Sequence, residues 1–356
     1  MVNAVVRGAP DRLYPALLAV LIGGGLLGGC APSPGPGAGD KTSAGKTSQE
    51  LLLVSYAVTK AAYDRILPRF QADWKARTGQ DLTIRASYGP SGVQTRAILD
   101  GIETDVATLA LAGDVETLQK ARLVQPGWQK ELPHNSMITE SVVVFVPRKG
   151  NPGRVRTWSD LARPGLSMIT ANPKTSGGAR WNFLGLWGSV TQTGGSEAQA
   201  RAFVSGVYRK VDNLPKDSRE AADLFLKRGI GDVLLTYENE AILAKRQGLL
   251  ESPFVVPTPN IRIEGPVVVL DRNVDRRGTR KAAEALATYL SGPQAQQIFA
   301  EEGFRPVNPS VWAQVKDRFT PVSRLYSAAD FGGWGKINTT FFSKGGLWDQ
   351  LFASSR

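Results

Sequence analysis

The chain has 356 residues, 42% of them hydrophobic, and its 43 Lys and Arg against 32 Asp and Glu give a formal net charge of +11. This length exceeds one typical hydrophobic core and predicts a globular protein of two lobes. The single histidine (His134, in a loop) and single cysteine (Cys30) exclude most metal sites and disfavour Ser-His-Asp or Cys-His catalysis. The basic residues are scattered rather than gathered in a stripe, which favours attraction of small anions, or contact with an anionic membrane surface, over nucleic-acid binding.

The N-terminal segment predicts export. In residues 1–29, Arg7 and Arg12 supply positive charge and residues 17–27 a glycine-rich apolar run, the pattern of a secretory signal. This run is shorter than the ~20 residues of a membrane-spanning helix. The sequence Leu27-Gly28-Gly29-Cys30 resembles a lipobox, in which Cys30 would become the lipidated N-terminus. Residues 30–49, with Pro, Gly, Ser, Thr and Lys, have the composition of a flexible tether.

Strand and helix patterns then alternate. We expect buried strands over 51–56, 81–88 and 105–109, and helices over 60–77, over 92–100 and after 109 up to about 122. Ser91 and Gln94 predict a capping box for the second helix. This βαβαβα order predicts a parallel sheet covered by helices on its faces.

The next elements predict a second lobe. The long apolar strand 138–146 is expected to cross into it. Strands 165–170 and 232–237 and helices 181–190, 197–208 and 219–227 follow. Strand 265–270 returns to the first lobe, which helices 279–290 and 293–300 complete. We therefore expect a first lobe of 50–141 and 262–310, a second lobe of 142–261, and a C-terminal helical tail of 311–356 that packs on the body through its aromatic residues.

The stretch 172–182 joins a strand to a helix. Thr175 or Ser176 fits the N-cap position, and Gly177 and Gly178 fall in the first turn, where backbone N–H groups can be approached closely. A helix N-terminus offers unpaired N–H donors and the positive end of the helix dipole, which together favour an anion. The same residues would also suit an ordinary capped helix.

Further helix starts follow Tyr56, Tyr88 and Tyr237, and another lies near Ser218. Ligands of open α/β sheets bind beyond the carboxyl ends of the strands, so these starts could form one cage of neutral donors. Such a cage suits an anion that presents only acceptors, whereas an anion that carries a proton, such as hydrogen phosphate, would leave that proton facing a donor. We therefore expect donors only, with no carboxylate and no direct salt bridge.

The run Pro173–Asn182 resembles a signature of the prokaryotic sulfate/thiosulfate-binding proteins, the extracytoplasmic receptors of ATP-driven importers. Six other stretches resemble the family in the same order over about 300 residues, namely 54–56, 88–92, 105–112, 148–152, 228–235 and 331–334. The resemblance implies a type II periplasmic binding-protein fold, an α/β architecture of two mixed-sheet lobes joined by two crossover strands. It also implies an envelope-located monomer that binds sulfate with high affinity between its lobes and delivers it to the importer's permease subunits. Catalytic residues, cofactors and metals are not expected.

The resemblance also implies which residues bind sulfate: the N–H of Ala57, the hydroxyl of Ser91, Ser176 with the N–H groups of Gly177 and Gly178, the N–H of Ser218, and the side chain of Tyr237. Ala57 stands where the family commonly has aspartate, Tyr237 where it has tryptophan, and the loop 216–219 lacks the usual glycines. The tyrosine leaves the choice among sulfate, thiosulfate and related oxyanions open. Arg180 and Arg219 are expected behind these residues, paired with glutamate or backbone.

Alternatives remain for individual residues. Ser91 could be only an N-cap and Tyr237 only a core aromatic residue. Asp217 and Glu220 could form the capping box of their helix, with Ser218 as a bystander.

Other functions also remain open. The ligand could be thiosulfate, molybdate or phosphate. A hydrolase or transferase could use Ser91 or Ser176 as nucleophile, but it would need a base within hydrogen-bond reach. A nucleic-acid-binding surface protein would show a steep salt dependence of binding. We find no Gly-x-x-x-x-Gly-Lys-Ser/Thr loop, so the energy for transport is expected from a partner ATPase.

Overall fold

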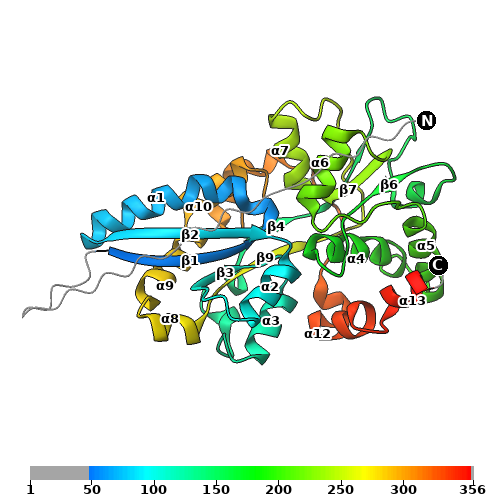
Figure 1. Ribbon diagram of the computed structural model, residues 1–356. Helices are drawn as coiled ribbons and strands as arrows, with labels where there is room; N and C mark the ends of the chain where they lie inside the picture. Colours follow the sequence, from blue (N-terminus) through cyan, green and yellow to red (C-terminus); the bar gives the residue numbers. More distant parts are fainter. Residues whose placement is uncertain (1–47, 354–356) are drawn as a thin grey trace, which may run out of the picture. The chain divides into compact units, whose positions relative to one another are not determined.

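The structure is a computed structural model that describes residues 48–353 (Figure 1). The expected signal segment, the lipobox cysteine Cys30 and nearly all of the tether lie outside the described residues. Within residues 48–353, no helix has both the length and the apolar composition needed to span a membrane.

The first sheet has five strands in the order β2-β1-β3-β9-β4. Strand β1 pairs in parallel with β2 and β3, whereas β9 runs antiparallel to β3 and β4. The strands are β1 (Ser48–Tyr56), β2 (Asp81–Gly89), β3 (Val106–Thr108), β4 (Met137–Ser141) and β9 (Ile263–Val269). The expected parallel strands are therefore present, and the single strand β9, which runs opposite to the other four, makes the sheet mixed.

Helices cover both faces of this sheet. Leu51 and Leu53 point to the face that packs against α1 (Lys60–Thr78), α9 (Arg280–Ser291) and α10 (Pro293–Glu301). The alternate residue Val54 points to the other face, against α2 (Ser91–Leu99) and α3 (Ala112–Lys120). Figure 1 shows α1 and α10 on one side of β1 and β2, with α2 and α3 on the other. This period-two alternation of buried side chains is what a sheet covered on both faces requires.

The second sheet has three strands in the order β5-β7-β6. These are β5 (Val143–Pro147), β6 (Met168–Ile169) and β7 (Val233–Tyr237). One face packs against α4 (Gly177–Thr191) and α5 (Glu197–Tyr208), the other against α6 (Ser218–Arg228) and α7 (Glu238–Arg246). The apolar run 143–147 is buried at every position because helices cover both of its faces.

The prediction of one strand over 138–146 is wrong, because this segment forms two strands that belong to different sheets. The chain leaves β4 at Ser141 and enters β5 at Val143. The return path, β8 (Asn260–Ile261), lies beside this break, because the Asn260 side chain donates to the Val143 carbonyl (2.8 Å) and accepts from its N–H (3.2 Å). The two crossovers are thus joined to each other where they pass between the sheets.

The C-terminal segment packs on the body. Its elements are α11 (Pro309–Val315), β10 (Leu325–Tyr326), α12 (Gly333–Ile337) and α13 (Leu347–Ala353). A further short helix, α8 (Asp271–Arg277), lies earlier in the chain, between β9 and α9. Trp334 meets the Trp181 ring edge to face with centroids 4.8 Å apart, and Phe342 and Trp348 contact Phe183. The described residues, 48–353, all belong to one compact unit by their contacts, so the lobe boundaries predicted from sequence stay a prediction.

Candidate functional site

One small pocket gathers every residue predicted to bind the anion. Its lining includes Ala57, Ser91, Ser176, Gly177, Gly178, Ser218 and Tyr237, together with six others, Tyr56, Val58, Gly89, Pro90, Ala110 and Asp217. These residues follow β1, β2 and β3 of the first sheet, or lie at the ends of β7, α4 and α6 around the second. Its volume is about 10 Å³, far below the several hundred Å³ of a pocket for a drug-sized molecule.

The pocket is surrounded by the N-termini of helices. Ser91 is the first residue of α2, Gly177 and Gly178 begin α4, Ser218 begins α6, and Tyr237 directly precedes α7. The first N–H groups of a helix have no acceptor within the helix, and their dipoles point into this space. The pocket therefore offers donors and a positive potential, the combination that binds an anion.

Two hydroxyl groups in the lining have no partner. Ser218 Oγ and Tyr237 OH are both fully buried and make no hydrogen bond. Burial raises the pKa of the Tyr237 phenol well above its usual range, so it keeps its proton at physiological pH and remains a donor. Because a buried unsatisfied hydroxyl costs about 1–3 kcal/mol, two of them in one pocket indicate an acceptor that binds there.

The glycines of α4 permit this close approach. A Cβ at Gly178 would lie 2.3 Å from Ser218 Oγ and 2.5 Å from Tyr237 Cε2. A Cβ at Gly177 would lie 2.5 Å from the Ala110 Cβ, on the opposite side of the pocket. Ser176 is the N-cap of α4, and its Oγ accepts from the Ala179 N–H at 3.3 Å, so its own hydrogen can point into the pocket. Of the two N-cap candidates, Ser176 is correct and Thr175 is wrong.

Ser91 has a partner that the sequence analysis missed. Its Oγ donates to Asp114 Oδ2 (2.6 Å) and accepts from the Ala110 N–H (3.0 Å). Burial raises the pKa of the Asp114 carboxyl, although Arg180 and the Ser91 hydroxyl act to lower it. If Asp114 is ionised, it accepts the hydrogen bond from the Ser91 hydroxyl, which then cannot donate to a ligand. If Asp114 is protonated, it can donate to Ser91 and free that hydrogen for a ligand.

The predicted capping box of Ser91 and Gln94 is wrong. Pro90 is the N-cap of α2 and makes no side-chain cap, and Gln94 Nε2 instead donates to Ser55 O and Ser87 Oγ. The reason is tertiary: Ser55 belongs to the neighbouring strand β1, and its carbonyl lies within reach of the glutamine.

The expected lining of donors alone is corrected by one residue. Asp217 lines the pocket as the N-cap of α6, and its Oδ1 accepts from the Glu220 N–H at 2.8 Å. Glu220 returns its carboxylate to the Lys216 N–H rather than to Asp217, so the reciprocal capping box is incomplete. Ser218, the next residue, also lines the pocket, and its hydroxyl is buried without a hydrogen-bond partner.

The nearby arginines are paired with other groups. Arg219 lies 2.8 Å from Glu240 Oε1, and Arg180 donates to the Pro173 carbonyl at 2.9 Å and lies 3.8 Å from Asp114. Among the residues that line the pocket in the described chain, none is lysine or arginine. Apart from the Asp217 carboxylate, the residues that line the space are thus neutral, and the charged side chains behind it compensate one another.

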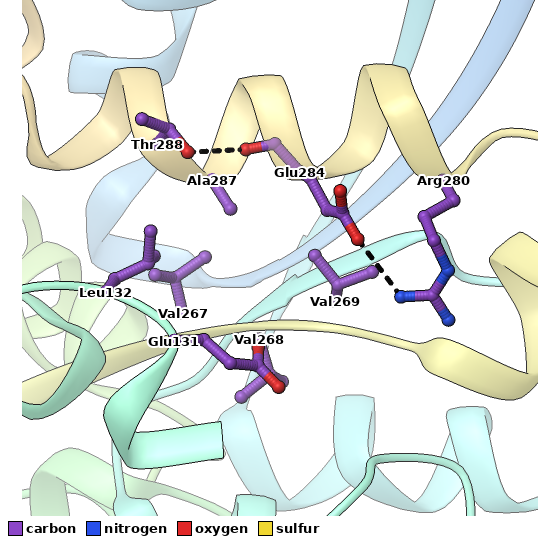
Figure 2. A pocket seen from close by; sticks show the side chains of 9 residues that line it. All are labelled: Glu131, Leu132, Val267, Val268, Val269, Arg280, Glu284, Ala287 and Thr288. Carbon is purple, nitrogen blue, oxygen red and sulfur yellow. Dashed lines mark hydrogen bonds and ion pairs between the residues drawn. The ribbon is translucent and has the colours of Figure 1, made fainter. Parts of the chain in front are cut away.

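A larger pocket elsewhere has the wrong chemistry for an anion. Figure 2 shows it between α9 and β9, with Glu131 and Glu284 on its walls and Arg280 already bound to Glu284. Its volume is about 360 Å³, and it contains none of the predicted site residues. Carboxylates facing the space would repel a dianion. The small pocket is therefore the candidate site.

Comparison with known proteins agrees with this geometry. The family model described as bacterial extracellular solute-binding protein matches residues 51–305. A sulfate-binding protein of Synechocystis is 50% identical over 317 residues, covering 89% of each chain. A thiosulfate-binding protein of Pseudomonas aeruginosa is 38% identical and covers 96% of this chain and 99% of its own length. The solved structure of the sulfate-binding protein SubI from Mycobacterium tuberculosis superposes with a TM-score of 0.76 at 35% identity, over 83% of this chain and 99% of SubI.

Two mixed sheets joined by paired crossovers, with helix N-termini around a pocket between them, define a receptor of the type II periplasmic binding-protein fold. Within that class, the chain belongs to the family of the sulfate/thiosulfate-binding proteins. The predicted fold and family are thereby confirmed.

Proposed function

We propose that the protein binds one sulfate dianion in the small pocket and delivers it to an ATP-driven sulfate importer. The observation that carries this proposal is the pair of buried, unpartnered hydroxyls of Ser218 and Tyr237 among four helix N-termini. Sulfate presents only acceptors, so these hydroxyls and the first-turn N–H groups can all donate to it. Relatives named for sulfate and for thiosulfate support the same ligand class.

Ala57, Ser176, Gly177 and Gly178 are proposed to complete the donor set, and Ser91 to join it when Asp114 is protonated. Arg180 and Arg219 are proposed to stay outside it, because their guanidinium groups are paired with Asp114, Glu240 and backbone.

Calorimetric titration tests the ligand. A chain that begins at residue 46, two residues before β1, would be dialysed extensively and titrated with sulfate, thiosulfate, molybdate and phosphate. The expected result is tight one-to-one binding of sulfate and no binding of phosphate, with a weaker response in Ser176→Ala and Ser218→Ala. Absence of binding for all four oxyanions would overturn the proposal.

Hydrogen phosphate is the second candidate, because Asp217 places a carboxylate in the lining. A carboxylate can accept the proton that phosphate carries, as a cage of donors alone cannot. Comparable affinity for phosphate and sulfate, with phosphate binding lost in Asp217→Asn, would favour this reading.

A receptor rather than an enzyme is proposed. The contact between Ser91 Oγ and Asp114 does place a carboxylate against a serine, as a hydrolase would require. The pocket, however, has a volume of only about 10 Å³, far below the several hundred Å³ of pockets that bind organic substrates. Hydrolysis of a p-nitrophenyl ester that disappears in Ser91→Ala would contradict this proposal.

Anchoring through lipidated Cys30 is also proposed, on the sequence pattern alone. Expression of the whole chain in a bacterial host should give a membrane-bound protein, and Cys30→Ser should release it into the soluble envelope fraction. Equal fractionation of the two forms would contradict the anchor.

A further inference from the structure

The first sheet has an open edge along the last residues of β9. Strand β4 pairs with β9 only from Ile263 to Pro266, and the residues just before β4 form a short 3-10 turn, His134–Ser136. Residues 267–269 therefore pair with β3 on one side and, within the described chain, with no strand on the other. Such an edge offers its backbone N–H and carbonyl groups to a segment that can lie beside it.

The hydrogen bonds to β3 show which backbone groups face this open side. The Leu109 N–H donates to the Pro266 carbonyl at 3.2 Å. The Leu270 N–H donates to the Asp105 carbonyl at 2.9 Å. Because bonded positions alternate along an antiparallel strand, the even-numbered residues of β9 face β3, and the N–H and carbonyl of Val269 point to the open side.

A pocket lies against the open edge, and it is the one drawn in Figure 2. We call it the edge pocket; it is bounded by β9, α9 and residues 131–132, and its volume of about 360 Å³ is in the range of pockets that bind ligands. Figure 2 shows Val267 and Val269 turned toward α9 and Val268 turned to the other side of β9, where Glu131 lies. A strand added beside β9 would keep this alternation, so its side chains would point in turn toward α9 and toward Glu131.

The cationic residue in the lining of the edge pocket is already paired with several carboxylates. Arg280 lies 2.9 Å from Asp271, 2.7 Å from Asp275 and 3.1 Å from Glu284. Three carboxylates thus share the single charge of one guanidinium, and this cluster keeps a net negative charge.

Glu131 adds a further carboxylate without compensation. It is exposed, and in residues 48–353 it forms no ion pair. Partial desolvation and the nearby Asp271 and Glu284 raise the pKa of Glu131, and the cation that acts to lower it is Arg280, which those carboxylates already share. The neighbouring Lys130 does not line the pocket. The edge pocket is therefore acidic, on a chain whose net charge is +11.

From these observations we propose that the edge pocket docks an extended protein segment in which apolar residues alternate with lysine or arginine. The segment pairs its backbone with Val269 as an added strand, places a basic side chain beside Glu131, and packs an apolar side chain against Ala287 of α9. The open backbone edge selects an extended chain, and the uncompensated carboxylates select its basic residues. The edge pocket shares no residue with the anion pocket, so this inference does not depend on the proposed function.

The test uses a fluorescently labelled, end-capped peptide Val-Lys-Val-Lys-Val, which places valines on one face of a strand and lysines on the other. Two peptides serve as its controls: Val-Glu-Val-Glu-Val, and the lysine peptide with methylated backbone nitrogens, which keeps its charge but cannot donate to a sheet edge. Affinity is measured by fluorescence anisotropy with the chain that begins at residue 46. The bound position is read from the amide resonance of Val269 in protein labelled with ¹⁵N-valine.

Glu131→Lys is the protein variant, and Glu197→Lys, at an exposed position outside the edge pocket, is its matched control. We expect the lysine peptide to shift the Val269 resonance saturably and to bind at least about 10-fold more weakly to Glu131→Lys, because a charge-assisted contact is lost. Glu197→Lys should bind it within about 2-fold of the parent, and neither control peptide should bind measurably. Sulfate titration of each variant should match the parent and shows that the variant is folded.

Four results would overturn the docking site. These are no binding of the lysine peptide, equal binding to Glu131→Lys and the parent, equal binding of the methylated peptide, or equal binding of 1,5-diaminopentane. The methylated peptide would exclude an added strand, and the diamine would show that the pocket takes small cations instead of a protein segment. A parent chain that binds the lysine peptide but no sulfate would overturn the proposed function alone.

Discussion

At the scale of single residues, removal of the Tyr237 hydroxyl is expected to affect sulfate binding but not the stability of the free protein. It is buried and unpartnered, so its removal should not destabilise the free protein, whereas sulfate would lose a charge-assisted hydrogen bond worth about 1.5–3 kcal/mol. Tyr237→Phe is therefore expected to weaken sulfate binding by about 10- to 100-fold without lowering the melting temperature of the unliganded protein.

Tyr326→Phe is the matched control, since its hydroxyl is also buried but donates to the Gly185 carbonyl at 2.7 Å, away from the pocket. It should show the opposite behaviour, with lower stability and unchanged affinity. Calorimetry measures the sulfate affinity of both variants, and thermal unfolding measures their stability. An unchanged sulfate affinity in Tyr237→Phe would mean that this tyrosine is only a core residue.

Glu240 gives the free protein a dependence on pH. Burial raises the pKa of its carboxyl from the ordinary 4.5 to about 7, although Arg219 acts to lower it. Because the folded-state pKa lies above the unfolded one, the stability contributed by the neutral form is complete below about pH 4.5 and is lost as the pH rises through about 7.

In Glu240→Gln, the loss of stability with rising pH that Glu240 causes should be absent. The unfolding free energy of the parent should fall relative to the variant by an amount on the order of 2 kcal/mol between about pH 5 and about pH 8. Denaturant unfolding of sulfate-free protein at the two pH values measures this difference in unfolding free energy. Glu197→Gln, at an exposed position, is the control and should show the same pH dependence of stability as the parent. Parallel pH profiles for parent and Glu240→Gln would contradict the assignment.

At the scale of elements, the N-terminus of α4 must come very close to α6 and β7. Gly178→Ala is expected to abolish measurable sulfate binding, because the new methyl group would collide with Ser218 Oγ and the Tyr237 ring. Gly335→Ala is the matched helical control, since a Cβ there meets nothing within 4 Å. Calorimetry should show normal sulfate binding in Gly335→Ala. Near-normal affinity in Gly178→Ala would show that the close packing around Gly178 is not needed for the site.

The same helix closes the site on its other side. Trp181, on α4, donates its indole N–H to the Ala110 carbonyl at 2.8 Å, which follows β3 of the first sheet. We expect Trp181→Phe to release sulfate several-fold faster with little change in the association rate, because the lost bond acts only after closure. Stopped-flow measurement of both rates tests this.

Trp74→Phe is its control, since Trp74 is equally buried but its indole N–H bonds to nothing across the boundary between the sheets. It should leave both rates unchanged. A change confined to the association rate in Trp181→Phe would show that the indole acts before closure.

At the scale of the whole molecule, the described residues 48–353 belong to one compact unit, and further contacts join the segments around the two sheets. Arg305 pairs with Glu238, at the start of α7, through two hydrogen bonds of 2.6 and 3.0 Å, and its backbone pairs with Glu140 of β4. The two lobes are therefore expected to unfold together in one transition.

Sulfate at about 100 times its dissociation constant should raise the unfolding free energy by about 2.7 kcal/mol and shift that whole transition. Scanning calorimetry with sodium sulfate, against sodium chloride of equal ionic strength, measures this. Two transitions, of which sulfate shifts only one, would show instead that the lobes unfold independently.

The local sequence sufficed for most of the elements. Helix α5 lies within its predicted bounds of 197–208, and α1, α6 and α10 lie within one residue of theirs, because their apolar periodicity and end signals are local. The stretch around Ser176 likewise predicted a capped helix with two glycines in its first turn. The split of the strand at Val142 was not predictable, because an unbroken apolar run gives no sign of which sheet each half joins.

The sequence by itself, together with the family resemblance, predicted which residues would offer donors and that they follow strands in the order of a two-lobed receptor. Only the tertiary structure decided which of those donors are free. The Ser91 hydroxyl is held by Asp114, whereas those of Ser218 and Tyr237 are unpaired, and Asp217 brings a carboxylate to the lining. Each of these outcomes depends on groups that the fold brings together from distant positions in the chain. The burial of these groups against one another sets their hydrogen bonds and their charge, and no local sequence pattern encodes it.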